Sequence, residues 1–91
     1  MEASKLLEKA RSLSPEERRV LAYFAENISV GELRAVKELR YIGISNPIQV
    51  IRKLVGMGFL EEGEECFNLA KPLRLYISRR GKHLLLQELR R

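Results

Sequence analysis

The chain has 91 residues, 45% hydrophobic and 32% charged, which is enough apolar material for one small core and predicts a single domain over residues 1–91. No apolar run approaches the length of a transmembrane helix and no signal peptide opens the sequence, so we expect a cytoplasmic protein without membrane contact. The single cysteine excludes an internal disulfide, and the single histidine, with no aspartate anywhere, argues against a metal site, a cofactor or an enzyme.

Charge is unevenly distributed along the chain. The formal net charge is +5, but residues 31–58 carry net +3 and residues 67–91 carry net +6, while residues 59–66 carry net −4. The two basic segments suit a polyanionic partner, and a local acidic segment separates them. All twelve acidic residues are glutamate, and this usage resembles that of proteins from hyperthermophiles.

The first third of the chain predicts two helices. Residues 2–13 place apolar side chains at helical spacing, and a second helix is expected from Ser14 to about Asn27. Ser14 is the expected N-cap of the second helix, Pro15 suits its first position, and Glu17 can complete a capping box. The positions of the second helix that we expect to be buried are Val20, Leu21, Phe24 and Ala25.

Residues 29–57 predict a helix-turn-helix. Ser29 is the expected N-cap of its first helix, and Gly43 lies in the expected turn. The second helix is expected to open at Asn46, with Pro47 at its first position. Two short helices joined by such a turn form a helix-turn-helix, and its second helix has a size and shape that fit a DNA major groove.

The last third predicts a β-hairpin wing over about residues 59–77 and a final helix over about residues 79–90, with Ser78 as its N-cap. The candidate strands are residues 59–62, 66–69 and 73–77. The expected fold class is therefore mainly α with a small β-hairpin wing (α+β), a winged helix-turn-helix three-helix core with additional N- and C-terminal helices. The expected shared core is Leu21, Phe24, Leu33, Val36, Leu39, Ile51, Leu54, Phe59 and Ile77.

Three segments carry a resemblance to a known family. They are ELRYIGIS at residues 38–45, RKLVGMGFLEE at residues 52–62 and ISRRGKHLL at residues 77–85. With them the chain resembles the winged-helix family of DNA-binding domains over roughly residues 14–90, most of all its MarR-type and ArsR-type branches in archaea and bacteria. This resemblance implies sequence-specific or semi-specific binding of double-stranded DNA by an archaeal-type transcriptional regulator.

The candidate DNA-binding residues come from three places. Gln49, Arg52 and Lys53 are expected on the outer face of the second helix of the helix-turn-helix, where Gln can pair with adenine and Arg with guanine. Ser45 and Asn46 lie at the N-terminus of that helix, where backbone N–H groups can hold a phosphate. The other candidates are Lys71 and Arg74 in the wing and Arg79 and Arg80 at the start of the last helix. The alternative is that Ser45 and Asn46 only cap the helix and that the basic residues are only solvated surface charges.

The terminal helices are rich in leucine. In winged-helix proteins such helices often form a dimer interface, so we expect a homodimer, and the alternative is that the same leucines close the core of a monomer. The residues concerned are Leu6, Leu7, Leu85, Leu86 and Leu89.

The hairpin tip favours a different class of function. Four glutamates, Glu61, Glu62, Glu64 and Glu65, surround the expected turn, and phosphate groups would repel them. A protein–protein adaptor, or an accessory subunit of a replication or transcription assembly, is therefore the alternative to a DNA-binding regulator.

Overall fold

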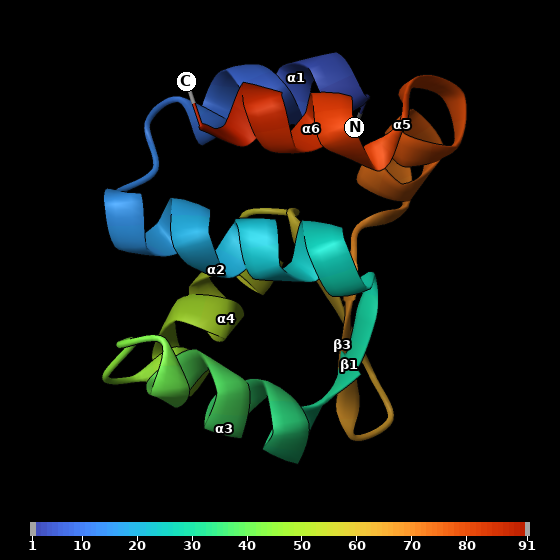
Figure 1. Ribbon diagram of the computed structural model, residues 1–91. Coiled ribbons are helices and arrows are strands. Elements are labelled where there is room, and N and C mark those ends of the chain that lie inside the picture. Colours follow the sequence, from blue (N-terminus) through green and yellow to red (C-terminus); the bar gives the residue numbers. More distant parts are fainter. Residues whose placement is uncertain (1, 91) are drawn as a thin grey trace.

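The computed structural model of the chain describes residues 2–90 and shows a mainly helical molecule with a small three-stranded antiparallel sheet (Figure 1). This confirms the predicted fold class. Across residues 2–90, every helix falls short of the length or apolarity that a membrane span requires. In chain order the elements are α1 (Ala3–Ala10), α2 (Pro15–Asn27), β1 (Ser29–Gly31), α3 (Glu32–Tyr41), α4 (Pro47–Gly56), β2 (Leu60–Gly63), β3 (Cys66–Leu69), α5 (Lys71–Arg80) and α6 (Lys82–Leu89).

Helix α2 lies in the middle of the molecule. Figure 1 shows α1 and α6 side by side at one end and α3 and α4 at the other, with α2 between them. Helix α2 contacts α6, α4, β1 and β3, so apolar side chains reach it from several directions. All four positions of α2 that the sequence predicted as buried are buried, because no side of their helical stripe is left to solvent.

The start of α2 follows the local signals in the sequence. Ser14 Oγ accepts a hydrogen bond from the Glu17 backbone N–H at 3.1 Å, and Glu17 Oε1 accepts one from the Ser14 backbone N–H at 2.9 Å. Pro15 occupies the first helical position. The predicted capping box is therefore confirmed, and it satisfies two backbone donors that the helix itself leaves unpaired.

The start of α3 differs from the prediction. Ser29 is not a helix cap but the first residue of strand β1, where it pairs with Asn68 of β3 and its hydroxyl donates to Asn68 Oδ1 at 2.5 Å. Gly31 is the N-cap of α3. Strand β1 pairs with β3, which lies far away in the sequence, so the local capping pattern at Ser29 could not predict this pairing.

The later start of α3 changes which face is buried. Ala35 and Leu39 are buried, whereas Leu33 is 85% exposed and Val36 is half-buried. The prediction that Leu33 belongs to the core is wrong. Of the other residues in the predicted core, Ile77 is half-buried and the following are buried: Leu21, Phe24, Leu39, Ile51, Leu54 and Phe59.

Two glycines shape the connections around α4. Gly43 in the turn between α3 and α4 has φ of 101°, and Gly58 just after α4 has φ of 90°, a region that side chains with a Cβ atom disfavour. Behind Gly58, the backbone N–H of Phe59 returns to the carbonyl of Leu54 at 3.0 Å, which closes the end of the helix. The prediction that Gly43 lies in the turn is confirmed.

The segment after the hairpin is a helix rather than a third strand. Residues 73–77, predicted as a strand, lie within α5, which begins at Lys71 with Pro72 in its first turn. The wing therefore consists of β2 and β3 alone, and β1 supplies the third strand of the sheet, in the order β1-β3-β2. The apolar side chains of 73–77 match both the helical and the strand period over so few residues. In the structure the backbone N–H of Arg74 bonds to the carbonyl of Ala70 at 3.0 Å, as in the first turn of a helix.

Candidate functional site

The outer face of α4 was the predicted DNA-recognition surface. In the structure its two cations form salt bridges with carboxylates of the same chain. Arg52 Nη1 lies 3.6 Å from Glu62 Oε1 of the hairpin, and Lys53 Nζ lies 2.5 Å from Glu17 Oε2 of α2. The hydrogen bond from Lys53 is the main reason that the pKa of Glu17 lies below its ordinary value. Two of the strongest predicted phosphate or base contacts thus already have carboxylate partners.

The N-terminus of α4 is arranged similarly. Ser45 and Asn46 are exposed, and Asn46 makes no side-chain cap. Its amide donates instead to Gln49 Oε1 at 3.0 Å, so the Gln49 side chain is engaged within the same turn. Of these predicted contacts, the side chains of Asn46 and Gln49 are bonded to each other.

The Arg74 side chain and the Lys71 backbone, both predicted for the wing, hold the hairpin in place. Glu61 of β2 accepts a hydrogen bond from the backbone N–H of Lys71 at 2.9 Å and one from Arg74 Nη1 at 3.0 Å. The bond from Lys71 is the main cause that lowers the pKa of Glu61. Arg74 also donates to the carbonyl of Leu69 at 2.6 Å. Arg74 therefore joins the hairpin to α5, and the acidic hairpin is partly neutralised by its own chain.

Arg79 and Arg80 do not lie at the start of the last helix. Both belong to the last turn of α5, and Ser78 lies inside that helix rather than capping α6. Cations are favourable at a helix C-terminus, so the helix dipole alone accounts for both arginines at this position. The guanidinium of Arg80 instead lies 6.0 Å from the ring centroid of Tyr76.

The terminal leucines close the core of the monomer. Leu6, Leu85 and Leu89 are almost fully buried, Leu86 is buried, and Leu7 is half-buried within the single chain. They are covered because α1 packs against α5 and α6, and α6 packs against α2. The predicted homodimer through these side chains loses its basis, and the alternative interpretation of the leucines is correct.

The surface with the most exposed apolar side chains lies on α3. Leu33 is 85% exposed and Tyr41 is 91% exposed, whereas the next large hydrophobic side chains are Leu75 at 43% and Ile42 at 42%. Residues 33, 37 and 41 follow one another at intervals of four, so they share one helix face. We call this face, with its flanking cations, the α3 surface. It consists of Leu33, Arg34, Lys37, Arg40 and Tyr41.

Contacts along one edge of this surface tie α3 to α2. The hydroxyl of Tyr23 on α2 donates a hydrogen bond to the Glu38 carboxylate, and Arg34 Nε lies 3.3 Å from the other oxygen of Glu38. Arg19 of α2 donates to the carbonyl of Ile42 at the end of α3. The α3 surface was not predicted, because Leu33 was expected in the core; the spacing of Leu33, Lys37 and Tyr41 was the available signal.

Comparison with protein families decides between the regulator and the adaptor. Residues 14–75 match the family PolB1 Binding Protein 2. The chain belongs to this family of DNA polymerase-binding proteins. A search of curated proteins finds no match.

Membership of the PolB1 Binding Protein 2 family corrects the earlier interpretation. The resemblance to MarR-type and ArsR-type regulators was wrong as a family assignment, and so was the prediction of a DNA-binding transcription regulator. Winged-helix architecture misled the analysis because a fold can carry unrelated functions. DNA contact by the nine candidate residues stays a prediction, and it loses its main support together with the regulator family.

The matched segment contains the whole α3 surface and the sheet, while α1 and α6 lie outside it. The exposed leucine and tyrosine of α3 are therefore the apolar side chains best placed for contact with a protein partner.

Proposed function

We propose that the chain is a non-catalytic accessory subunit that binds the DNA polymerase PolB1 through the α3 surface. The observation that carries this proposal is the exposure of Leu33 and Tyr41 on one face of a helix within the segment that matches the polymerase-binding family. In this proposal the protein needs no cofactor or metal, and its predicted cytoplasmic location stays a prediction.

The apolar side chains would supply most of the binding free energy. Removing a leucine side chain from water is worth about 1.5–3 kcal/mol, and tyrosine is among the side chains most often found at the energetic centre of interfaces. Leu33 and Tyr41 are two turns apart on α3, so one apolar groove of a partner can receive both.

The cations of the α3 surface would select the partner. Arg34, Lys37 and Arg40 are exposed beside the two apolar side chains. Of these three cations, Arg34 alone forms a salt bridge within residues 2–90. Charges at the rim of an interface act on specificity and association rate more than on affinity. The polymerase surface that we expect is therefore an apolar groove with an acidic rim.

Titration of purified PolB1 with the chain tests the proposal. The double variant Leu33→Ser/Tyr41→Ser should lose about 100-fold in affinity by calorimetry, since each side chain is expected to contribute at least about 1.4 kcal/mol. Both side chains are exposed, so the variant should keep its melting temperature. The matched control is Leu75→Ser on α5, a half-exposed leucine away from the α3 surface, which should bind PolB1 like the parent.

Two results would contradict the proposal in different ways. A parent chain that does not bind PolB1 would overturn the accessory-subunit function. A double variant that binds as tightly as the parent would retain the function but remove the α3 surface as the place of contact.

A further inference from the structure

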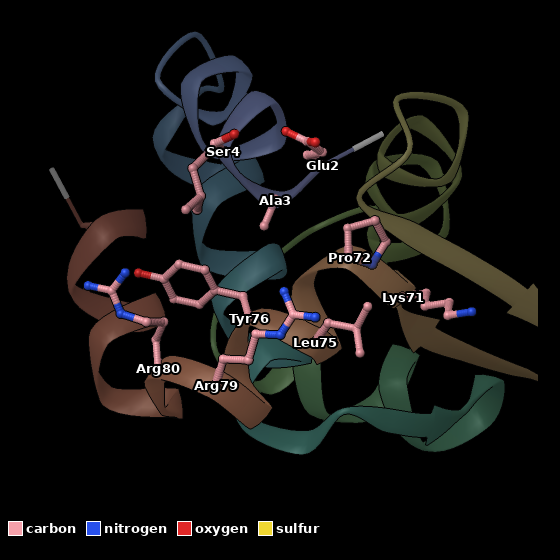
Figure 2. Close-up of a pocket in the computed structure, with 10 residues that line it drawn as sticks. Glu2, Ala3, Ser4, Lys71, Pro72, Leu75, Tyr76, Arg79 and Arg80 are labelled. Carbon is pink, nitrogen blue, oxygen red and sulfur yellow. The ribbon is translucent and has the colours of Figure 1, made fainter.

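A second surface lies between α1 and α5. It is a groove with a volume of about 580 Å³, and its apolar side chains come from Ala3 and Leu7 of α1 and from Pro72, Leu75 and Tyr76 of α5. Figure 2 shows these α5 residues along one side of the groove and Ala3 on the other. The volume falls in the range of ligand and peptide sites, so the groove can receive at least one apolar side chain.

Cations that form no salt bridge within residues 2–90 lie around this groove. Lys71, Arg79 and Arg80 line it, and within residues 2–90 none of these side chains forms a salt bridge, in contrast to Arg52, Lys53 and Arg74. A single acid, Glu2, faces the three cations across the groove. This charge imbalance favours an anionic ligand.

The positions of the cations set the size of the ligand. Lys71 and Arg80 lie at opposite ends of α5 (Figure 2), nine residues apart and therefore separated by about 13 Å along the helix axis. Four steps of an extended peptide cover about the same length, and residues i, i+2 and i+4 of such a peptide point to one side. A segment with acids at i and i+4 and an apolar residue at i+2 matches the two cationic ends and the apolar middle.

A peptide fits this groove better than a nucleic acid. Four of the five apolar side chains that line the groove are aliphatic, and the ring of Tyr76 already lies against the Arg80 guanidinium. Bases bind single-strand sites chiefly by stacking on aromatic rings, and the groove offers only this one among its lining residues.

We propose that the α1/α5 groove binds a short acidic segment of a second protein, of the pattern acid–x–aliphatic–x–acid in extended conformation. Helices α1 and α5, which line the groove, lie at the opposite end of the molecule from α3 (Figure 1), so the groove and the α3 surface can be occupied at once. The chain would then connect PolB1 to another protein, a role that rests on the proposed function of the α3 surface. The α1 side of the groove and the arginines Arg79 and Arg80 lie outside the residues that match the polymerase-binding family.

The probe is the acetylated and amidated peptide Gly-Glu-Thr-Leu-Thr-Glu-Gly, titrated into isotope-labelled full chain and followed by amide chemical shifts. We expect saturable shifts in α1 and α5, with a Kd on the order of 0.1–1 mM for so short a segment. Replacing both glutamates of the peptide by lysine, or its leucine by serine, should weaken binding at least about 10-fold, since each change removes one of the two complementary features.

Variants of the chain locate the site. Leu75→Ser and the double variant Arg79→Ser/Arg80→Ser should each weaken peptide binding about 10-fold, while Leu33→Ser/Tyr41→Ser should bind the peptide like the parent. All five substituted side chains are exposed, so melting temperatures should not change. Absence of saturable shifts, equal binding of the lysine peptide, or shifts centred on α3 would overturn the proposal.

Titration in the presence of PolB1 separates this proposal from the proposed function. If PolB1 leaves the affinity for the peptide unchanged, a second protein is the occupant. If PolB1 displaces the peptide, or if Leu75→Ser loses PolB1 binding, the polymerase itself occupies the groove and the second-protein proposal is wrong. A chain that fails to bind PolB1 but binds the peptide would overturn only the proposed function.

Discussion

Tyr23 of α2 donates a hydrogen bond from its hydroxyl to the Glu38 carboxylate of α3, and this contact fixes the orientation of the α3 surface. The bond has opposite effects on the two groups. It is the main cause that lowers the pKa of Glu38, and it adds to burial in raising the pKa of Tyr23. At neutral pH Glu38 therefore stays ionised and Tyr23 stays protonated, which are the forms that make this hydrogen bond.

Removing this hydroxyl should loosen α3. Tyr23→Phe is expected to lower the free energy of unfolding, because the half-buried Tyr23 side chain loses its hydrogen bond between α2 and α3. Urea denaturation measures the change. Tyr41→Phe is the matched control, since the Tyr41 ring is 91% exposed and its variant should unfold like the parent. Equal stability of the two variants would mean that the Tyr23 bond does not hold α3.

The ion pair of Lys53 should matter more for stability than that of Arg52. Lys53→Ala removes the partner of Glu17, whose side chain is only 13% exposed, and should cost about 1 kcal/mol. Arg52→Ala breaks a longer pair in which both side chains are about half exposed, so its cost should stay within a few tenths of a kcal/mol. Chemical denaturation of both variants tests the order, and a larger loss for Arg52→Ala would contradict it.

Acid should destabilise the fold through Glu17 and Glu61. Their pKa values are lower in the folded chain, chiefly because of hydrogen bonds from the Lys53 side chain and the Lys71 backbone. A lowered folded pKa contributes stability above the ordinary carboxyl pKa of 4.5, and that stability disappears as the pH falls below this value. We expect the melting temperature to be flat around neutral pH and to fall below about pH 4.5.

A variant of the hairpin isolates one part of this pH dependence. Glu61→Gln should melt lower than the parent at pH 7 and lose less on acidification, since its side chain no longer takes up a proton. Glu64→Gln, at the exposed tip of the same hairpin, should follow the parent curve. Melting curves at several pH values distinguish the two, and identical curves for Glu61→Gln and the parent would refute the role of Glu61.

Two leucines should respond very differently to the same truncation. Leu54→Ala in α4 removes a fully buried side chain and should cost about 2–5 kcal/mol. Leu33→Ala in α3 removes an exposed one and should change stability by less than about 0.5 kcal/mol, while it weakens PolB1 binding. Thermal denaturation with a parallel binding titration measures both. A large loss of stability for Leu33→Ala would mean that Leu33 is covered in the folded chain.

The sequence by itself determined the elements whose signals are local. The capping box at Ser14, the turn glycines Gly43 and Gly58, and the buried positions of α2 and α4 all follow from short-range patterns. Fold class followed as well, because helix-turn-helix and hairpin spacing constrain how these elements can pack. Such patterns are reliable where propensity, capping and hydrophobic period agree with one another.

Only the tertiary structure decided what depends on partners distant in sequence. Pairing with β3 made Ser29 a strand residue, delayed the start of α3 and turned Leu33 outward. Glu17 and Glu62 neutralise the cations of the predicted recognition helix, and no spacing rule relates either one to Arg52 or Lys53. Strand pairing and ion pairing join residues that the chain brings together only on folding, so the character of each surface was set by contacts that local sequence does not contain.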